Sequence, residues 1–202
     1  MFNSAAEIQF SEAVALFKNG KYIEAAGMFD VVHRLKPVHQ RTTAAYLMLA
    51  KSWFKLRKYQ PSALLLLEYL ERFPASSYGD DAYYTLGLDH MMDGQFEEAG
   101  TEFLRSLERT EDHDLARRAG TLFEYVADER MAVPGLERLL RQPFRAPLND
   151  LIRLKLAGKC AAGGDSPRAK QLLYGLVTGE AGSPYQQRAR EFLPDHRRRV
   201  QH

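Results

Sequence analysis

Residues 80–103 read DDAYYTLGLDHMMDGQFEEAGTEF, and the spacing within this stretch decides the fold. Before the break at Asp93-Gly94, five residues stand at helical intervals: Ala82, Tyr83, Leu86, Gly87 and His90. After the break, a second apolar stripe has a period near 3.6 and consists of Phe96, Ala99, Phe103 and Leu107. Glycine is expected at the break because a helix commonly ends on a residue with positive φ. The stretch therefore predicts two amphipathic helices joined by a tight turn.

The same pattern recurs at an offset of 37 residues. Five aligned columns carry it: Gly20, Arg57 and Gly94; Tyr22, Tyr59 and Phe96; Ala25, Ser62 and Ala99; Phe29, Leu66 and Phe103; and Pro37, Pro74 and Glu111. Small residues are expected where two helix backbones cross closely, and aromatic residues where the space between helices is filled. Proline after the second helix cannot continue it and so ends the unit. These columns predict three clear units, at residues 6–37, 43–74 and 80–111.

Beyond residue 111 the repeat weakens. A degenerate unit at 113–143 contains an amphipathic helix at 114–127 and a candidate partner at 132–141, without a fixed register. A clearer unit spans 150–180, where Gly163-Gly164-Asp165 forms the turn and Ser166-Pro167 is expected to supply the N-cap and the first helical position. A last helix, 184–194, runs from Ser183-Pro184 to the stop at Pro194. Its polar residues suit a terminal cap, because the end of a solenoid must face water.

The motif Tyr83-x2-Leu86-Gly87 … Gly94-x-Phe96-x2-Ala99-x3-Phe103 resembles the tetratricopeptide repeat (TPR) consensus, a helix–turn–helix unit of about 34 residues. This chain departs from the consensus at Arg57, at Ser62 and in the missing third proline. The resemblance implies an all-α fold: a right-handed α-solenoid of about five helix–turn–helix repeats plus a C-terminal capping helix. We expect these repeats to form a single domain over residues 1–202.

The connector at residues 74–87 carries a narrower resemblance. It is similar to the P-x-S-x-Y-x3-A-x-Y-x-L-G connector of bacterial cell-envelope repeat proteins, such as the lipoprotein subunit of the outer-membrane β-barrel assembly machine and the Tol-Pal-associated periplasmic repeat protein. Ser183-Pro184-Tyr185 with Ala189 is a shorter echo. No lipobox cysteine is present, and Phe2-Asn3-Ser4 does not begin a signal peptide. The resemblance implies a periplasmic or envelope-associated protein, and a cytoplasmic protein is the alternative.

In TPR folds the first helices of successive repeats line the concave surface. The resemblance therefore implies a partner-binding groove made of Phe10, Val14, Phe17, Lys18, Leu47, Lys51, Phe54, Lys55, Tyr84, Leu88, Met91 and Met92. Apolar, aromatic and methionine side chains with interspersed lysines suit an extended peptide or an amphipathic helix. The alternative is that several of these side chains, Phe17 and Phe54 above all, are core residues between helices. Because Phe10 and Val14 cannot hydrogen-bond a carboxylate, the pattern argues against a clamp for chaperone C-termini.

Composition narrows the function classes. The net charge of +2 is too balanced for the basic stripe of a nucleic-acid-binding protein. No apolar run approaches the roughly 20 residues that span a bilayer. The leucine run 64–67 is flanked by charges and is interpreted as a buried helix face. The single cysteine, Cys160, allows no intrachain disulfide and is expected to be a buried helix residue.

Neither a catalytic, a metal nor a cofactor site is predicted. The best cluster of acidic residues with a histidine is 111–114, which we interpret as a solvated loop whose Asp112 or Asp114 caps the next helix. The motifs G-x-S-x-G and H-E-x-x-H, the P-loop and the dinucleotide fingerprint are all absent from the sequence. The short basic tail at Arg197–Arg199 is interpreted as a solvated end or the start of a linker.

These observations predict a non-catalytic scaffold that binds another protein through an apolar peptide or helix, in a bacterial cell-envelope assembly. Two alternatives stay open at this point. One is a cytoplasmic TPR scaffold or regulator that uses the same groove. The other is the TPR domain of a larger exported protein, fused to a solute-binding or enzymatic domain. The sequence leaves the oligomeric state open.

Overall fold

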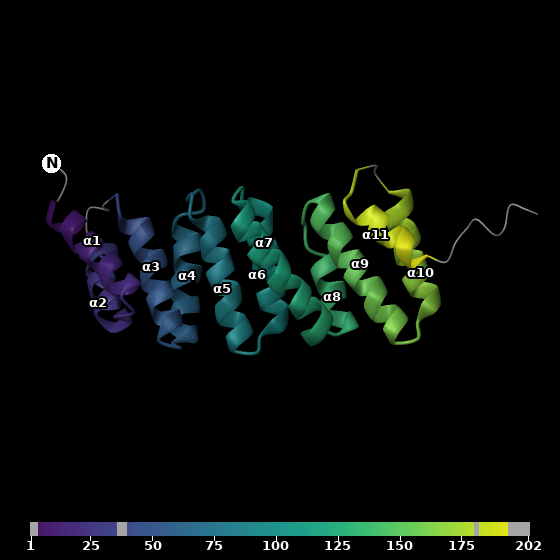
Figure 1. Ribbon diagram of the computed structural model, residues 1–202, viewed down its shortest axis with the longest axis horizontal. Helices are drawn as coiled ribbons and strands as arrows, with labels where there is room; N and C mark the ends of the chain where they lie inside the picture. The colour runs from purple at the N-terminus through teal and green to yellow at the C-terminus, as the bar shows by residue number, and fades with distance from the viewer. Residues whose placement is uncertain (1–3, 36–39, 180–181, 194–202) are drawn as a thin grey trace, which may run out of the picture. The chain divides into compact units, whose positions relative to one another are not determined.

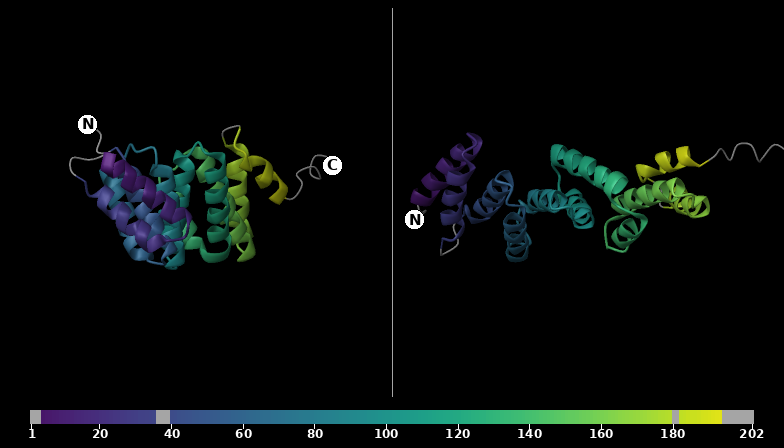
Figure 2. Two further views of the ribbon diagram at one scale, coloured as in Figure 1. Left: turned by 60° about the vertical axis from the view of Figure 1, so that its left-hand side comes forward. Right: turned by 90° about the horizontal axis from the view of Figure 1, so that it is seen from below.

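The computed structural model describes residues 4–35, 40–179 and 182–193, and these contain helices, turns and bends without a β-strand. The helices are α1 (Ser4–Lys18), α2 (Tyr22–His33), α3 (Thr42–Lys55), α4 (Tyr59–Arg72), α5 (Gly79–Met92), α6 (Phe96–Arg109), α7 (His113–Tyr125), the π-helical segment η1 (Val126–Arg130), α8 (Val133–Leu140), α9 (Ala146–Ala162), α10 (Ser166–Thr178) and α11 (Tyr185–Phe192). They follow one another as helix–turn–helix units (Figures 1 and 2). The predicted all-α solenoid fold is confirmed.

The chain is organised as two compact units, residues 1–120 and 121–202, called here the N-terminal and C-terminal units. The N-terminal unit contains the three clear repeats, α1–α2, α3–α4 and α5–α6. In Figure 1 the turns inside these three repeats lie along the lower edge, and the connector between α4 and α5 lies along the upper edge. A single domain over residues 1–202 stays a prediction.

The repeat turns share one backbone geometry. After α1, the amide of Gly20 donates to the Phe17 carbonyl and the amide of Lys21 donates to the Leu16 carbonyl. This pair of bonds is the Schellman motif, which needs a positive φ at its central residue. The same bonds recur after α3, α5 and α9, where the central residues are Arg57 (φ 59°), Gly94 (φ 77°) and Gly164 (φ 86°). The predicted glycine column is therefore confirmed, and Arg57 adopts the same conformation despite its side chain.

The small and aromatic columns meet in the core. Ala25, Ser62 and Ala99 have no exposed surface, and neither do Phe29, Leu66 and Phe103. Ser62 replaces the small alanine without leaving a buried hydroxyl unsatisfied, because it donates to the Ala50 carbonyl over 3.0 Å. The departure of the second unit from the consensus at this position is thus structurally accommodated.

The connector motif between α4 and α5 is held by side-chain hydrogen bonds. The hydroxyl of Ser76 accepts one bond from the Tyr69 hydroxyl and another from the backbone amide of Tyr78. Arg109 on α6 donates to the Pro74 carbonyl over 2.8 Å and lies 5.8 Å from the centre of the Tyr83 ring. The serine and proline of the motif therefore fix the path of the chain into α5. Pro37, the equivalent proline of the first unit, lies outside the described residues.

The degenerate fourth repeat is now placed. The helix predicted at 114–127 is α7, which continues as the π-helix η1, and the partner predicted at 132–141 is α8. Two lysines of α9 bind the end of α7 and the segment η1. Lys155 lies 2.7 Å from both Glu124 and Asp128, and Lys159 donates to the Asp128 carbonyl. Periodicity could not reveal this extension, because the lysines that hold it come from the next repeat.

The predictions for single residues are confirmed at two positions and wrong at one. Cys160 is buried, and Asp112 caps α7 by accepting hydrogen bonds from the amides of Asp114 and Leu115, as predicted. The N-cap of α10 is Asp165 and not Ser166, since the Asp165 carboxylate accepts the Arg168 amide. Pro194 and the basic tail lie outside the described residues.

The interpretation of the leucine run as a buried face is wrong for two of its four residues. Leu65 and Leu66 are buried, whereas Leu64 is 69% exposed and Leu67 is 46% exposed.

Candidate functional site

A groove between α1 and α3 contains half of the residues predicted to bind a partner. This first-helix groove encloses about 380 Å³ and lies wholly within the N-terminal unit. Its lining residues are Phe10, Val14, Phe17, Lys18, Ala44, Leu47, Met48, Lys51, Tyr78 and Asp81. Six of them belong to the predicted set. The structure thus brings together the predicted side chains of the first helix and the middle of the third.

Aromatic contacts hold the groove side chains in place. Phe10 packs edge-on against the buried Phe29, with ring centres 5.6 Å apart, and Phe17 packs on Tyr22 at 5.2 Å. Both phenylalanines are half-buried, so one part of each ring contacts α2 and another part borders the groove. Leu47 is only 4% exposed and belongs to the core as well as to the groove floor. The groove is therefore built on the core and does not depend on mobile surface chains.

An ion pair borders the groove. Lys51 on α3 lies 2.6 Å from Asp81 on α5, and both side chains are about two-thirds buried, at 28% and 31% exposure. Tyr78, at the start of α5, borders the groove with 40% exposure. Lys51 was predicted as a groove lysine, but its charge is neutralised within the fold and is not available to a partner.

The other six predicted residues lie outside the first-helix groove. Phe54 packs on Tyr59 with ring centres 5.5 Å apart, which repeats the Phe17–Tyr22 pair one unit later. Tyr84 lies 6.0 Å from Phe103 and 5.1 Å from the guanidinium of Arg118. The rest are Lys55 and Met92, which are exposed, and Leu88 and Met91, which are half-buried. Of all twelve predicted residues, only Leu47 is buried, and the other eleven keep exposed surface.

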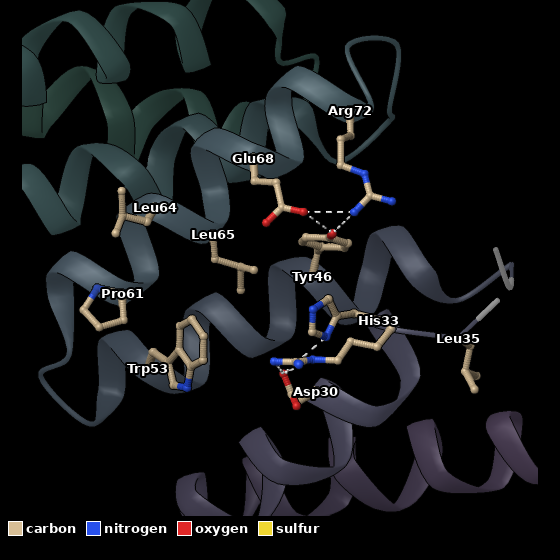
Figure 3. A pocket seen from close by; sticks show the side chains of 11 residues that line it. Asp30, His33, Leu35, Tyr46, Trp53, Pro61, Leu64, Leu65, Glu68 and Arg72 are labelled. Carbon is tan, nitrogen blue, oxygen red and sulfur yellow. Dashed lines mark hydrogen bonds and ion pairs between the residues drawn. The ribbon is translucent and has the colours of Figure 1, made fainter. Parts of the chain in front are cut away.

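A second groove was not anticipated from the sequence. This second-helix groove encloses about 710 Å³ among α2, α3 and α4. Figure 3 shows apolar side chains at one end, namely Trp53, Pro61, Leu64 and Leu65, and polar ones at the other, namely Asp30, His33, Glu68 and Arg72. The leucine run 64–67 could have indicated this groove, because four consecutive residues of one helix cannot all face the protein core.

Three residues at the polar end of the second-helix groove form hydrogen bonds with one another. The Tyr46 hydroxyl donates to Glu68 over 2.8 Å, and Arg72 bonds both groups. Burial raises the pKa of Tyr46 to about 12, so the hydroxyl keeps its proton. The bond from Tyr46, aided by Arg72, lowers the pKa of Glu68. These three groups stabilise one another, whereas the buried Nδ1 of His33 has no hydrogen bond among the described residues and lies 3.6 Å from Asp30.

Two buried carboxyl groups have raised pKa values and lie outside both grooves. Burial raises the pKa of Asp89 to about 8 and that of Glu102 to about 7, the latter against the opposing effect of Arg105. Neither carboxyl borders any of the grooves described above. Within the described ranges, no group of three His, Cys, Asp or Glu side chains could hold a metal ion. None of the described helices is both long and apolar enough to cross a membrane.

Known proteins that are similar to this chain were found among solved structures only. No family model matches the chain, and no curated protein matches it. A solved structure from Podosopora anserina, described as kinesin light chain with nearly identical TPR-like repeats, is 19% identical over 85% of this chain and 92% of that one, with a TM-score of 0.48. A single-residue variant of that protein is 20% identical over the same shares, with the same TM-score. The chain is similar to TPR-like repeat structures.

Proposed function

We propose that this chain is a non-catalytic scaffold that holds an apolar peptide or amphipathic helix of a partner protein in the first-helix groove. The observation that supports the proposal is the groove itself, where apolar side chains of α1 and α3 surround about 380 Å³ of open space. Water in such a groove is readily displaced by an apolar side chain, which gives binding energy in proportion to the area buried. Grooves between helices are a recurring way to bind an amphipathic helix or an extended peptide.

The first-helix groove is preferred over the larger second-helix groove on chemical grounds. Polar groups in the second-helix groove are already paired with each other through Tyr46, Glu68 and Arg72. Displacing Glu68 and Arg72 would leave the buried Tyr46 hydroxyl without its partners. In the first-helix groove, the exposed Lys18 has no such internal partner among the described residues, so a guest can bind there without breaking an existing pair.

We extend the proposed surface along the first helices of the second and third repeats. Phe54 and Lys55 on α3, and Tyr84, Leu88, Met91 and Met92 on α5, keep exposed surface beyond the groove. Methionine adapts to irregular partner surfaces because its side chain is unbranched and polarizable. A guest longer than the groove would contact these residues next.

Site-specific photo-crosslinking tests the location. A photoreactive phenylalanine analogue replaces Val14 in the first-helix groove, and in a control protein it replaces Leu64, which borders the second-helix groove. Irradiation in cells should give a defined protein adduct at position 14 and none at position 64. An adduct at position 64 alone would contradict the placement.

We propose a bacterial cell-envelope assembly as the setting, and the connector motif at residues 74–87 is its support. A cytoplasmic scaffold, or a TPR domain fused to a solute-binding or enzymatic domain in a larger exported protein, is the alternative. Expression of the gene from its own start codon, followed by separation of periplasm from cytoplasm, distinguishes them. Recovery in the cytoplasm alone would exclude the envelope setting.

A further inference from the structure

Most cations of the N-terminal unit are neutralised by the fold. Ion pairs at 2.9 Å join Arg34 to Asp30, Arg41 to Glu7 and Arg72 to Glu68, and a shorter one joins Lys51 to Asp81. The remaining pairs are Arg105 with Glu102, Arg117 and Arg118 with Asp114, and Arg109 with the Pro74 carbonyl. Surface cations in this unit therefore usually have a partner nearby.

Among the described residues of this unit, five cations break this rule, and all five lie at two turns. They are Lys18, Lys21, Lys55, Arg57 and Lys58. Each is exposed, and none has a side-chain hydrogen bond or an ion pair within the described part of the chain. The turns that carry them, α1–α2 and α3–α4, lie along the same lower edge in Figure 1. We call these five residues the basic turn edge.

Two of these lysines oppose the local electrostatics. Lys21 and Lys58 occupy the N-cap positions of α2 and α4, and neither helix has a side-chain cap. The N-terminus of a helix carries partial positive charge, so a cation there is unfavourable and an aspartate is preferred. The equivalent positions of later repeats carry Gln95 and Asp165, and Asp165 does cap its helix. The lysines thus reduce helix stability at a place where better caps are available.

The basic turn edge adjoins the first-helix groove. Lys18 belongs to both, and Lys55 lies one helical turn beyond the groove residue Lys51. The turn between α5 and α6 carries negative charge instead, because Asp93, Glu97 and Glu98 lie at or next to it. Among the described residues of the N-terminal unit, the exposed cations without a partner therefore occur only in the two repeats that form the groove. Such a charged edge attracts an anionic group and raises its local concentration.

We propose that the segment bound in the first-helix groove is an apolar peptide continued by acidic residues, and that these acidic residues lie along the basic turn edge. This inference rests on the proposed function, because the apolar part needs the groove. It names the chemical class of the guest through charge complementarity. A peptide is favoured over an extended anionic polymer because the cations border an apolar groove on one side and an acidic turn on the other.

Peptide selection tests the chemistry directly, because it requires no candidate partner. A display library of random 12-residue peptides is selected on the full chain, and the binding of each selected peptide to a Val14→Glu variant is then measured to identify the peptides that need the groove. Selected peptides should share apolar residues followed by several Asp or Glu. Replacing these acids by Asn or Gln should weaken binding at least tenfold at 50 mM salt. Screening should shrink that difference to about threefold or less at 0.5 M salt.

The two proposals fail in different ways in this experiment. Groove-dependent peptides without acidic enrichment would overturn the acidic guest and leave the groove function standing. A selection that yields peptides insensitive to Val14→Glu, or none at all, would overturn both. Cosedimentation with vesicles of phosphatidylserine and phosphatidylcholine is measured in parallel. Lysine-dependent vesicle binding together with acid-free peptides would show that the edge contacts a membrane and would also overturn the inference.

A stabilising variant separates charge from folding. The double variant Lys21→Asp and Lys58→Asp adds a helix cap to α2 and α4, so its melting temperature should rise. Its affinity for a selected acidic peptide should nevertheless fall at least tenfold. The matched control, Gln95→Asp, adds the same cap to α6 outside the basic turn edge and should leave the affinity unchanged. Unchanged affinity of Lys18→Gln combined with Lys55→Gln, or of the double aspartate variant, would overturn the inference.

Discussion

Gly87 on α5 faces the ring of Phe103 on α6 so closely that a Cβ atom on Gly87 would lie 2.7 Å from two of the ring carbons. Phe103 has no exposed surface, so its ring has no free space into which to move. Gly87→Ala should therefore destabilise the protein by about 1–3 kcal/mol, as overpacking does in other cores. Urea unfolding followed by helicity measures the change.

Gly27 is the matched control for this prediction. It lies on the exposed side of α2, and a Cβ atom there would meet nothing within 4 Å. Gly27→Ala should stabilise the protein by up to about 1 kcal/mol, because alanine has the higher helix propensity. If both alanine variants shift stability in the same direction, the close contact between α5 and α6 is not what constrains position 87.

Arg57 carries a side chain where the other repeat turns have glycine. Its φ of 59° places it in the left-handed region, which is unfavourable for a residue with a Cβ atom. Arg57→Gly should raise stability by about 0.5–1 kcal/mol, since glycine adopts this conformation freely. The reverse change at the equivalent position, Gly94→Val, should lower stability, because a branched residue resists positive φ. The midpoints of thermal unfolding of the two variants should move in opposite directions.

Asp89 should make stability depend on pH. The side chain is fully buried, and burial raises its pKa to about 8 from the ordinary value of 3.8, against the opposing effect of the nearby Ser62 hydroxyl. Between these two values the folded protein holds a proton that the unfolded chain has lost, so stability falls as pH rises from about 4 to about 8. Glu102 contributes in the same direction up to about pH 7.

Asp89→Asn removes the titrating group and should flatten this dependence. The gain in melting temperature relative to the unmodified chain should therefore be larger at pH 8 than at pH 5. Melting curves across this range, with Glu102→Gln as the comparison variant, measure it. An equal effect of Asp89→Asn at both pH values would show that Asp89 is ionised in the folded protein.

The sequence predicted what depends on spacing along one chain segment. Columns such as Ala25, Ser62 and Ala99 lie where the repeat places them, because each is fixed by helix contacts inside its own unit. The predicted groove positions of Phe10 and Val14 came instead from the resemblance to TPR folds, and both residues line the first-helix groove. Side chains that depend on a neighbouring repeat could not be predicted in this way. The ion pair between Lys51 and Asp81 is one example, since it joins helices of different units.

The second-helix groove was missed for a related reason. A run of apolar residues in a helix predicts burial only if a neighbour covers the whole face, and nothing in the described chain covers Leu64. Sequence periodicity reports which face of α4 is apolar, but the width of the covered part depends on how α2 and α3 pack beside it. The sequence predicted Ser166 as the N-cap of α10, whereas the structure has Asp165 there. Both adjacent residues have side chains that can cap a helix, so the sequence alone did not distinguish them.

The extent of the partner surface can be decided by two variants. Val14→Glu places a charge in the first-helix groove at a half-exposed site, so helicity should be retained while affinity for a selected peptide falls at least tenfold. Leu64→Glu is the matched control, because it places the same charge on an exposed leucine that borders the other groove and should leave the affinity unchanged. A loss of affinity in both variants would point to a general effect of charge.

Phe54→Ala combined with Tyr84→Ala asks whether the surface continues past the groove. Both rings are half-buried and pack on an aromatic neighbour, Tyr59 and Phe103 respectively, so some loss of stability accompanies the change. If the guest extends along α3 and α5, the double variant should bind a long selected peptide several-fold more weakly while its circular dichroism spectrum stays helical. A short peptide that fills only the first-helix groove should bind it as before. Extensive loss of helicity would instead identify Phe54 and Tyr84 as core residues, and the partner surface would then end at the groove between α1 and α3.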